Sequence, residues 1–345
     1  MIENKNIMVL LSLVVVASGC AHTATSQTSQ ATSDSVSINN FSAFPNNNVY
    51  NNQNVRLELT LQNDGEATAE NVKARLFNVP FGSGDSEWTG LQSRTVSFGT
   101  LEPRDEEANL PARESTEFWS AEAPSLEDGV TIPYQFMTEI FYNYETQGTT
   151  SITLMNQQRF REEGNPSRPT LDTTSGPIQM EVRTRSPIVF YPGDGSDRQS
   201  EMCVIVTNNG QGTPFWSSNI EDGDYQDIGE EERNKVRLRV EDQGRIEFSN
   251  SESGDDSNTA IVDIFGNRGI GCFNINVDNW NQGVGPQEEV PIVMTADYGY
   301  SKESSTSVTV TGSERFGSPS STDTGDNDNS DDDEPDIGSP SSPGS

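Results

Sequence analysis

The chain has 345 residues, of which 54 are Asp or Glu and 21 are Lys or Arg, so its formal net charge at pH 7 is −33. Such a polyanion repels phosphates, which excludes nucleic acid as a partner and makes anionic membrane surfaces poor ones. Only four of the cations are lysines, and acidity of this kind is typical of proteins from highly saline habitats, where salt screens self-repulsion. Hydrophobic residues make up only 31% of the chain but gather in alternating runs, which predicts thin β-sandwich cores rather than global disorder.

Residues 1–19 have the pattern of a secretory signal peptide. A mostly apolar run from Ile7 to Ala17 is too short to span a membrane as a helix, which needs about 20 apolar residues. The run leads to Ala17-Ser18-Gly19-Cys20, which resembles the lipobox of prokaryotic lipoproteins, in which the cysteine thiol receives a diacylglyceryl group. We therefore expect cleavage after Gly19, lipidation of Cys20, and an extracytoplasmic protein held on the cell membrane by its lipid. The alternative is an ordinary signal peptide followed by an incidental cysteine.

Residues 20–33 lack apolar periodicity and predict a lipidated, flexible tether. From 34 to 156 the chain shows repeated strand signals. In the clearest one, Val55, Leu57, Leu59 and Leu61 alternate with polar residues before the turn Asn63-Asp64-Gly65. No segment carries a convincing helical period, and turn residues recur about every ten positions, the spacing expected in a sandwich. The fold class predicted is all-β.

Further along, residues 157–176 lose the alternation and collect Pro, Gly and charge, which indicates an interdomain linker. Strand signals return from 177 to 311 and predict a second β-rich domain. Residues 312–345 are rich in Asp, Asn, Ser and Pro and contain little that could bury apolar surface, so we expect a disordered acidic tail. With the lipid at the other end, this order predicts a molecule that is held at its N-terminal end and extends away from the membrane.

The two β-rich segments repeat each other. Tyr142-Asn143-Tyr144 is followed by Ser151–Leu154, and Tyr298-Gly299-Tyr300 by Ser307–Val310, with the same offset because 298 − 142 and 307 − 151 are both 156. Near the domain starts, Asn63-Asp64-Gly65 parallels Asn208-Asn209-Gly210. Matching strand pairs in the same order indicate a tandem duplication.

These residues carry a family resemblance. A strand, then the segment Asn63 to Val72, then a closing Tyr-x-Tyr hairpin resembles the immunoglobulin-like, CARDB-type adhesion-related domains of bacterial and archaeal surface proteins. Together with the acidity and the lipobox, the chain resembles a haloarchaeal-type surface lipoprotein. The resemblance implies two tandem immunoglobulin-like β-sandwiches, at 34–156 and 177–311. The second domain departs from the pattern, since it lacks the Asn-Val pair and carries a long acidic insertion around Glu221 to Asp256.

The same resemblance implies a disulfide. In an immunoglobulin-like sandwich, the second strand and the strand before the last hairpin are antiparallel neighbours in one sheet. Cys203 lies on the first of these strands between core-facing Met202 and Val204, and Cys272 precedes core-facing Phe273 on the other. We expect a cross-strand Cys203–Cys272 disulfide on the outer face of the sheet. Two free thiols are the alternative.

The inventory of chemical groups argues against catalysis. His22 is the only histidine and lies in the tether, which excludes a histidine-based triad. A cysteine nucleophile is excluded if Cys20 is acylated and the other two cysteines are paired. Carboxylate pairs stay open because Asp and Glu are everywhere, but no P-loop or dinucleotide fingerprint is present. We expect no enzyme and no cofactor.

Three weaker signals concern ligands and modification. Asp222, Asp224 and Asp227 place oxygen ligands on one loop, a weak candidate for calcium against the alternative of a plain acidic surface loop. Trp216 and Trp280 lie in irregular segments and are better candidates for a partner surface than the other aromatic residues, most of which period-2 spacing places in the core. Asn40-Phe41-Ser42 is the one convincing glycosylation sequon, and the sequence does not say whether it is used.

These observations predict a non-catalytic, cell-surface lipoprotein that presents tandem immunoglobulin-like modules. Its expected partners are the membrane, through the lipid anchor, and a protein or glycan of the cell envelope. The alternative is a solute-binding or enzyme-accessory lipoprotein with a site between the two domains. A cleft between the domains would favour this alternative.

Overall fold

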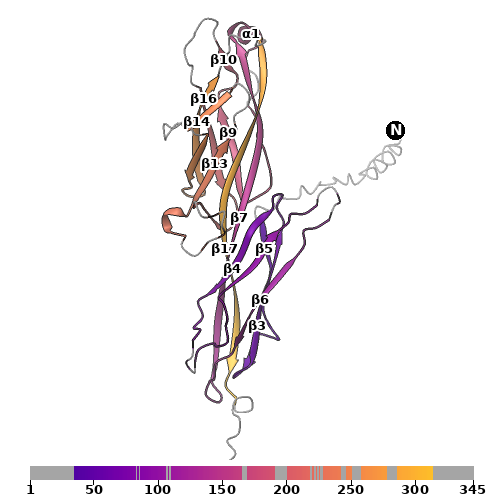
Figure 1. Cartoon of the computed structure of the whole chain (residues 1–345), viewed down its shortest axis with the longest axis vertical. Helices are drawn as coiled ribbons and strands as arrows, with labels where there is room; N and C mark the ends of the chain where they lie inside the picture. Colours follow the sequence, from indigo (N-terminus) through magenta and orange to yellow (C-terminus); the bar gives the residue numbers. More distant parts are fainter. Residues whose placement is uncertain are drawn as a thin grey trace, which may run out of the picture.

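The computed structural model describes residues 35–313, except for 83, 85, 106, 107, 109, 165–168, 191–199, 218, 219, 221, 222, 224, 226, 227, 242–245, 251–257 and 278–285. In this part β-strands are the main regular structure (Figure 1). Besides strands and loops, the described part contains the α-helix α1 (Gln157–Glu163) and a 3₁₀ turn at Glu230–Glu232. The predicted all-β fold is confirmed. Neither helix of the described part is long and apolar enough to cross a membrane.

The strands form three sheets. The smallest has the order β1-β3-β6, with bounds Val36–Phe44, Asn54–Asn63 and Ser115–Glu122. A four-stranded sheet has the order β14-β16-β11-β9, with bounds Ile246–Asn250, Arg268–Val277, Ser200–Asn208 and Ile178–Thr184. The largest runs β15-β13-β17-β7-β4-β5, with bounds Thr259–Asp263, Lys235–Val240, Gln287–Thr311, Thr131–Asn156, Ala69–Phe77 and Thr95–Leu101. Short strands flank it: β2 (Asn48–Tyr50), β8 (Asp172–Thr173), β10 (Ile188–Phe190) and β12 (Thr213–Phe215).

Two very long strands, β7 and β17, run through the whole molecule (Figure 1). They pair antiparallel along the full 25 residues of β17, from Thr131↔Thr311 to Met155↔Gln287. At about 3.3 Å per residue this ribbon is about 80 Å long. The prediction of a hairpin that closes at Tyr142-x-Tyr144 is therefore wrong, because β7 passes through that motif and continues to Asn156. The Thr-rich stretch from 146 to 153 has the β-branched residues that favour an extended chain.

The ribbon joins two sandwich-like halves. We call the lower half β1–β6 together with residues 131–144 of β7 and 301–311 of β17. The upper half is β9–β16 together with residues 145–156 of β7 and 287–300 of β17. In the upper half β16 packs face to face on the large sheet, since a Cβ at Gly271 would lie 3.2 Å from Leu238 of β13. In the lower half β17 packs against β1, and β5 against β6.

The two repeats exchange the ends of their last strands. The last part of β7 leaves the lower half and pairs with β10 of the upper half, where Ile188 lies opposite Leu154. The last part of β17 does the reverse and pairs with β2, where Val49 lies opposite Val310. Leu154 and Val310 are both fully buried and are separated by the repeat offset, since 310 − 154 is 156. Each half thus completes its core with a strand end from the other repeat.

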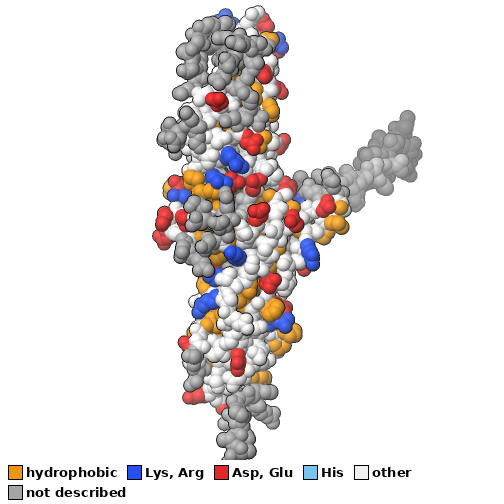
Figure 2. Space-filling view, in the orientation of Figure 1, with side chains coloured by type: hydrophobic (Ala, Val, Ile, Leu, Met, Phe, Trp, Pro, Cys, Tyr) orange, Lys and Arg blue, Asp and Glu red, His pale blue; other side chains and the backbone are white. Residues whose placement is uncertain are grey.

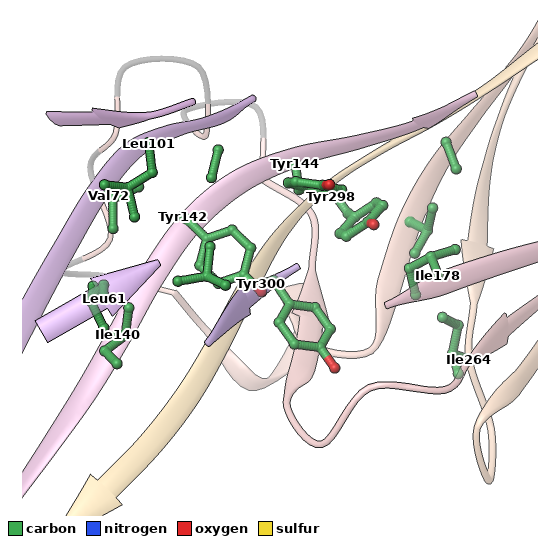
Figure 3. Packing of buried hydrophobic residues seen from close by; sticks show 14 of the residues in the cluster. Leu61, Val72, Leu101, Ile140, Tyr142, Tyr144, Ile178, Ile264, Tyr298 and Tyr300 are labelled. Atoms are coloured by element: carbon green, nitrogen blue, oxygen red, sulfur yellow. The ribbon is translucent and has the colours of Figure 1, made fainter. Parts of the chain in front are cut away.

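The halves meet at what we call the waist, around the cross-strand pair Asn143↔Gly299. Here the two Tyr-x-Tyr motifs lie directly opposite each other, and all four rings are buried (Figure 3). Ring centroids are 5.7 Å apart for Tyr142 and Tyr300 and 6.1 Å apart for Tyr144 and Tyr298. Because these rings belong to one hydrophobic cluster that reaches from Val36 to Val310, the core is continuous across the waist.

The Asn-x-Gly turns of the two repeats have the same local structure. The Asn63 side chain donates to the Ala67 carbonyl (2.8 Å) and accepts from the Gly65 amide (3.1 Å). Asn208 makes the corresponding bonds to Gly212 (3.0 Å) and from Gly210 (3.2 Å). The amide of Ala67 then donates to the Tyr144 hydroxyl, just as that of Gly212 donates to the Tyr300 hydroxyl. The parallel found in the sequence is a parallel in hydrogen bonding.

The predicted disulfide is confirmed. Cys203 of β11 and Cys272 of β16 are direct cross-strand partners, with Cα atoms 4.1 Å apart, and their sulfurs are bonded. The neighbours Met202, Val204 and Phe273 point into the core with no exposed surface. The bridge therefore lies on the outer face, as expected. A loop of 69 residues closed in this way contributes about 4 kcal/mol in the chain-entropy model.

Candidate functional site

A groove of about 700 Å³ lies at the waist, on the outer face of the large sheet. Its floor comes from β7 and β17, whose side chains alternate across the ribbon. Tyr144 and Tyr298 point inward, while Asn143, Glu145 and Asp297 point outward. One wall is the segment between the Asn63 turn and the start of β4. The other is the segment that follows β12, including Trp216. The groove therefore exists only because the two halves meet.

The charged residues that line the groove are mostly acidic. It contains the carboxylates of Glu66, Glu70, Glu145 and Asp297, against the single cation Arg237. Arg237 is already engaged, because its Nε and Nη2 atoms both lie 3.1 Å from Oδ2 of Asp297. The remaining charge favours cationic or hydroxyl-rich ligands over anions. Acidic side chains also gather across the middle of the face shown in Figure 2.

Trp216, which the sequence singled out for a partner surface, lines this groove. The guanidinium of Arg237 lies 4.1 Å from the centre of its ring, a cation–π contact that covers one face of the indole. The other candidate, Trp280, lies outside the described residues. Whether Trp216 contacts a partner stays a prediction.

The buried tyrosines under the groove supply hydroxyl groups rather than acid–base catalysis. Burial raises the pKa of Tyr144 to about 12 and that of Tyr298 well above its ordinary value. Both therefore stay protonated at neutral pH, and their hydroxyls serve the structure. Tyr144 donates to the Ser175 carbonyl, and Tyr298 shares a hydrogen bond of 2.9 Å with Thr146.

The acidic insertion of the second repeat reaches back onto the first. Its first part lies between β12 and β13 of the upper half. The corresponding position in the lower half lies within β4, whose pairing with β7 is irregular between Glu70 and Lys73. Tyr225 of the insertion stacks on Phe141 with ring centroids 5.4 Å apart, and its hydroxyl donates to Asn143. Burial raises the pKa of Tyr225 as well. The insertion therefore packs on the outer face of the waist.

A smaller cavity of about 160 Å³ lies beside this part of the insertion. Lys73 and Arg75 line it, together with the rings of Phe141 and Tyr225. The Nη2 atom of Arg75 lies 3.1 Å from Oε2 of Glu139, and Lys73 donates a hydrogen bond to the carbonyl of Gly223 (2.5 Å). Lys73 thus holds the insertion to β4, and Arg75 joins β4 to β7.

Several residues predicted to act as sites lie outside the described part of the chain. These are the lipidation residue Cys20 and the calcium candidates Asp222, Asp224 and Asp227. Among the described residues, Glu201, Cys203 and Cys272 form the one group of potential metal ligands. It does not suit a metal, because disulfide-bonded sulfurs are not thiolates.

One surface was missed by the sequence reasoning. Most aromatic residues are buried as predicted, including Trp119 at 2% exposure, but its neighbour Phe118 is 48% exposed on the outer face of β6. The Arg56 guanidinium lies 4.6 Å from the Phe118 ring and 5.9 Å from that of Phe44. The alternation of side chains in β6 could have predicted this exposure, because the neighbours Trp119 and Phe118 cannot both face the core.

Comparison with known proteins adds little. No protein-family model matches the chain, and no curated protein matches it. Among solved structures, it is similar to the secreted serine protease VesC from Vibrio cholerae, with 9% identity, a TM-score of 0.17, and coverage of 73% of this chain and 48% of that one. It thus spans about half the length of VesC. The CupB6 tip adhesin from Pseudomonas aeruginosa matches with 8% identity, a TM-score of 0.15, and coverage of 75% and 90%.

Proposed function

We propose that this protein is a non-catalytic, lipid-anchored surface protein that holds two CARDB-type, immunoglobulin-like sandwiches as one rod for structural or adhesive contacts at the cell envelope. The observation that carries the proposal is the β7–β17 ribbon. A ribbon that is paired along 25 residues, and whose inward face packs in a continuous core, resists bending between the halves. Such a rod suits the separation of two contact points better than the enclosure of a substrate.

The outer-face disulfide supports an extracytoplasmic location, since such bonds persist in oxidising compartments. The lipid on Cys20 is the proposed anchor. Ser35, the first described residue, lies at the waist, with its hydroxyl 3.0 Å from that of Tyr142. The rod would then be held near its middle and not at one end, which revises the arrangement expected from the chain order. A tether of 14 residues, 20–33, spans at most about 50 Å.

Replacement of the lipidated cysteine tests the anchor. Cys20→Ser should move the protein from the membrane fraction to the soluble or secreted fraction. Cys203→Ser is the matched control, because it replaces a disulfide-bonded cysteine of the folded part and should leave the protein on the membrane. Retention of Cys20→Ser on the membrane would contradict the proposed anchor. Crosslinking on intact cells would then identify what the rod contacts.

A solute-binding role is the second candidate, and the groove at the waist favours it. Its position between the two halves and its four carboxylates suit a small cationic solute. Thermal melts with spermidine or arginine, at a salt concentration high enough to screen general binding, would show a rise in Tm if such a site exists. Asp297→Asn should reduce that rise. An unchanged Tm with both solutes counts against this role.

A further inference from the structure

The outer face of the three-stranded sheet presents the sequon Asn40-Phe41-Ser42 in an ordered strand. The register of β1 against β3 shifts between Ile38 and Asn40, the mark of a β-bulge. Because of this bulge, Asn40 lies opposite outward-facing Thr60 and is exposed, while Phe41 lies opposite buried Leu59. Bulges commonly turn a side chain toward a functional direction. Here the bulge brings both Asn40 and Ser42 to the solvent face.

The two polar residues of the sequon are already in contact. The Asn40 Nδ2 atom donates a hydrogen bond of 2.9 Å to the Ser42 hydroxyl. The residue between them is anchored, since the Phe41 ring packs edge-on against Trp119 with centroids 6.3 Å apart. The sequon therefore has a hydroxyl residue at its third position, no proline at its second, and an exposed amide nitrogen.

An exposed aromatic surface lies on the same face. We call Phe44, Arg56 and Phe118 the platform. Phe44 is 57% and Phe118 48% exposed, and Arg56 stands between the two rings. The register places Phe44 opposite Arg56, and Phe118 opposite Glu58, which in turn lies opposite Ser42. Since neighbouring strands are about 4.8 Å apart, the platform is within reach of the first sugars of a glycan on Asn40.

We propose that Asn40 carries an N-linked glycan whose proximal sugars lie on the platform. The proposal rests on the proposed extracytoplasmic location, because glycosyl donors for asparagine act on exported chains. In the reaction, Asn40 Nδ2 attacks the anomeric carbon of a sugar activated by a phosphate ester. The new N–C bond replaces the C–O bond to phosphate, and the amide gives up one proton to the departing phosphate. No oxidant or reductant is needed.

The platform explains why the sugar would stay ordered. The apolar C–H face of a pyranose ring covers an aromatic ring in the way that other apolar groups do, and so removes exposed Phe118 and Phe44 surface from water. The polar neighbours Ser42, Glu58 and Thr60 offer hydrogen-bond partners to sugar hydroxyls. A glycan so placed would also cover a flat sheet face that otherwise invites association.

Mass spectrometry of the protein purified from the membranes of its native cells tests the modification. The peptide that contains Asn40 should carry hexose or hexosamine mass increments. Asn40→Gln and Ser42→Ala should both abolish them, whereas Asn39→Gln, a neighbouring exposed asparagine outside the sequon, should keep them. An unmodified Asn40 peptide in exported, membrane-bound protein overturns the glycan but leaves the proposed function intact. A protein that is not exported overturns both.

A double-mutant cycle tests the platform. Phe118→Ala should lower the Tm of the glycosylated protein by about 2–4 °C more than it lowers the Tm of Asn40→Gln. Equal losses in the two backgrounds would mean that the glycan does not contact Phe118. Phe265→Ala is the control, because Phe265 is an exposed phenylalanine of the upper half (81% exposed), and its effect should not depend on the glycan.

Discussion

Asn63 and Asn208 show how one residue sets the local structure of each repeat. Each side chain bonds to the backbone on both sides of its turn and so presents an amide to a buried tyrosine hydroxyl. Tyr300 completes this arrangement in the upper half, because its hydroxyl also donates to Asn208 (3.0 Å). Buried polar groups of this kind are costly when one partner is removed. The waist thus depends on individual hydrogen bonds as well as on apolar packing.

Stability above pH 10 should depend on Tyr144. Its pKa is raised by burial from 10.0 to about 12, so its contribution is complete below pH 10 and is lost as pH rises toward 12. The unfolded chain ionises first, which favours unfolding by up to about 3 kcal/mol. Tyr144→Phe should therefore show a shallower fall of Tm between about pH 10 and 12 than the wild type. A parallel fall would show that Tyr144 does not carry this dependence.

Loss of the disulfide should destabilise the protein without changing its shape. Cys203→Ser with Cys272→Ser should lower the free energy of unfolding by up to about 4 kcal/mol, because the unfolded chain regains the freedom of its 69-residue loop. Denaturant melts in reducing buffer give the same comparison for the wild type. If the double variant and the oxidised wild type had equal midpoints, the bridge would make no contribution.

At the scale of elements, the exchange of strand ends is the dominant feature. Residues 145–156 of β7 belong to the first repeat in sequence and to the upper half in space. Residues 301–311 of β17 show the reverse. A substitution in residues 145–156 should therefore destabilise the upper half, and one in residues 301–311 should destabilise the lower half.

Leu154→Ala tests this exchange. Leu154 is fully buried in the upper half, and its truncation should cost about 2–5 kcal/mol. Hydrogen exchange should accelerate first in β9, β10 and β11 of the upper half, while β3 of the lower half stays protected. Val310→Ala is the matched variant, for which the order should reverse. Faster hydrogen exchange in β3 after Leu154→Ala would contradict the exchange of strand ends between the repeats.

Local patterns in the sequence predicted the strands but not the exchange. Alternation at Val55 to Leu61 predicted β3, and alternation around Cys203 and Cys272 placed the disulfide on the outer face. The path of β7 beyond Tyr144 was missed because Glu145 to Ser151 is polar and resembles a turn region. In the structure this stretch pairs with β17, a partner more than 130 residues away, and at Gly148 and Thr149 with the short strand β8. The β-branched residues of this stretch favour an extended chain, but they do not identify its long-range partner.

At the scale of the whole molecule, the groove illustrates the same limit. Trp216 was expected at a partner surface, and it lines the groove, but the carboxylates around it come from segments that are distant in sequence. Glu66 and Asp297 were indistinguishable from other surface acids, because the chain contains 54 of them. Their grouping follows from the way the halves meet at the waist, which the sequence reasoning did not foresee.

The net charge of −33 should make the stability of the whole molecule depend on salt. Self-repulsion destabilises the compact state, and salt reduces the Debye length from about 10 Å at 0.1 M to about 3 Å at 1 M. The Tm should therefore rise between 0.1 M and 1 M sodium chloride at pH 7. At pH 4, where many carboxylates are protonated, the rise should be smaller. A Tm that falls with salt at pH 7 would contradict this account.

The exchange of strand ends also limits how many copies of this repeat one molecule can contain. In ordinary tandem arrays each repeat contacts its neighbours through open ends, and further copies can be added. Here β7 occupies the place beside β10, and β17 occupies the place beside β2, so each repeat both gives and receives one strand end. A third copy inserted after Thr311 would find no free place for its own strand end. The pair is closed, as a two-fold symmetric dimer is closed, although both members belong to a single chain.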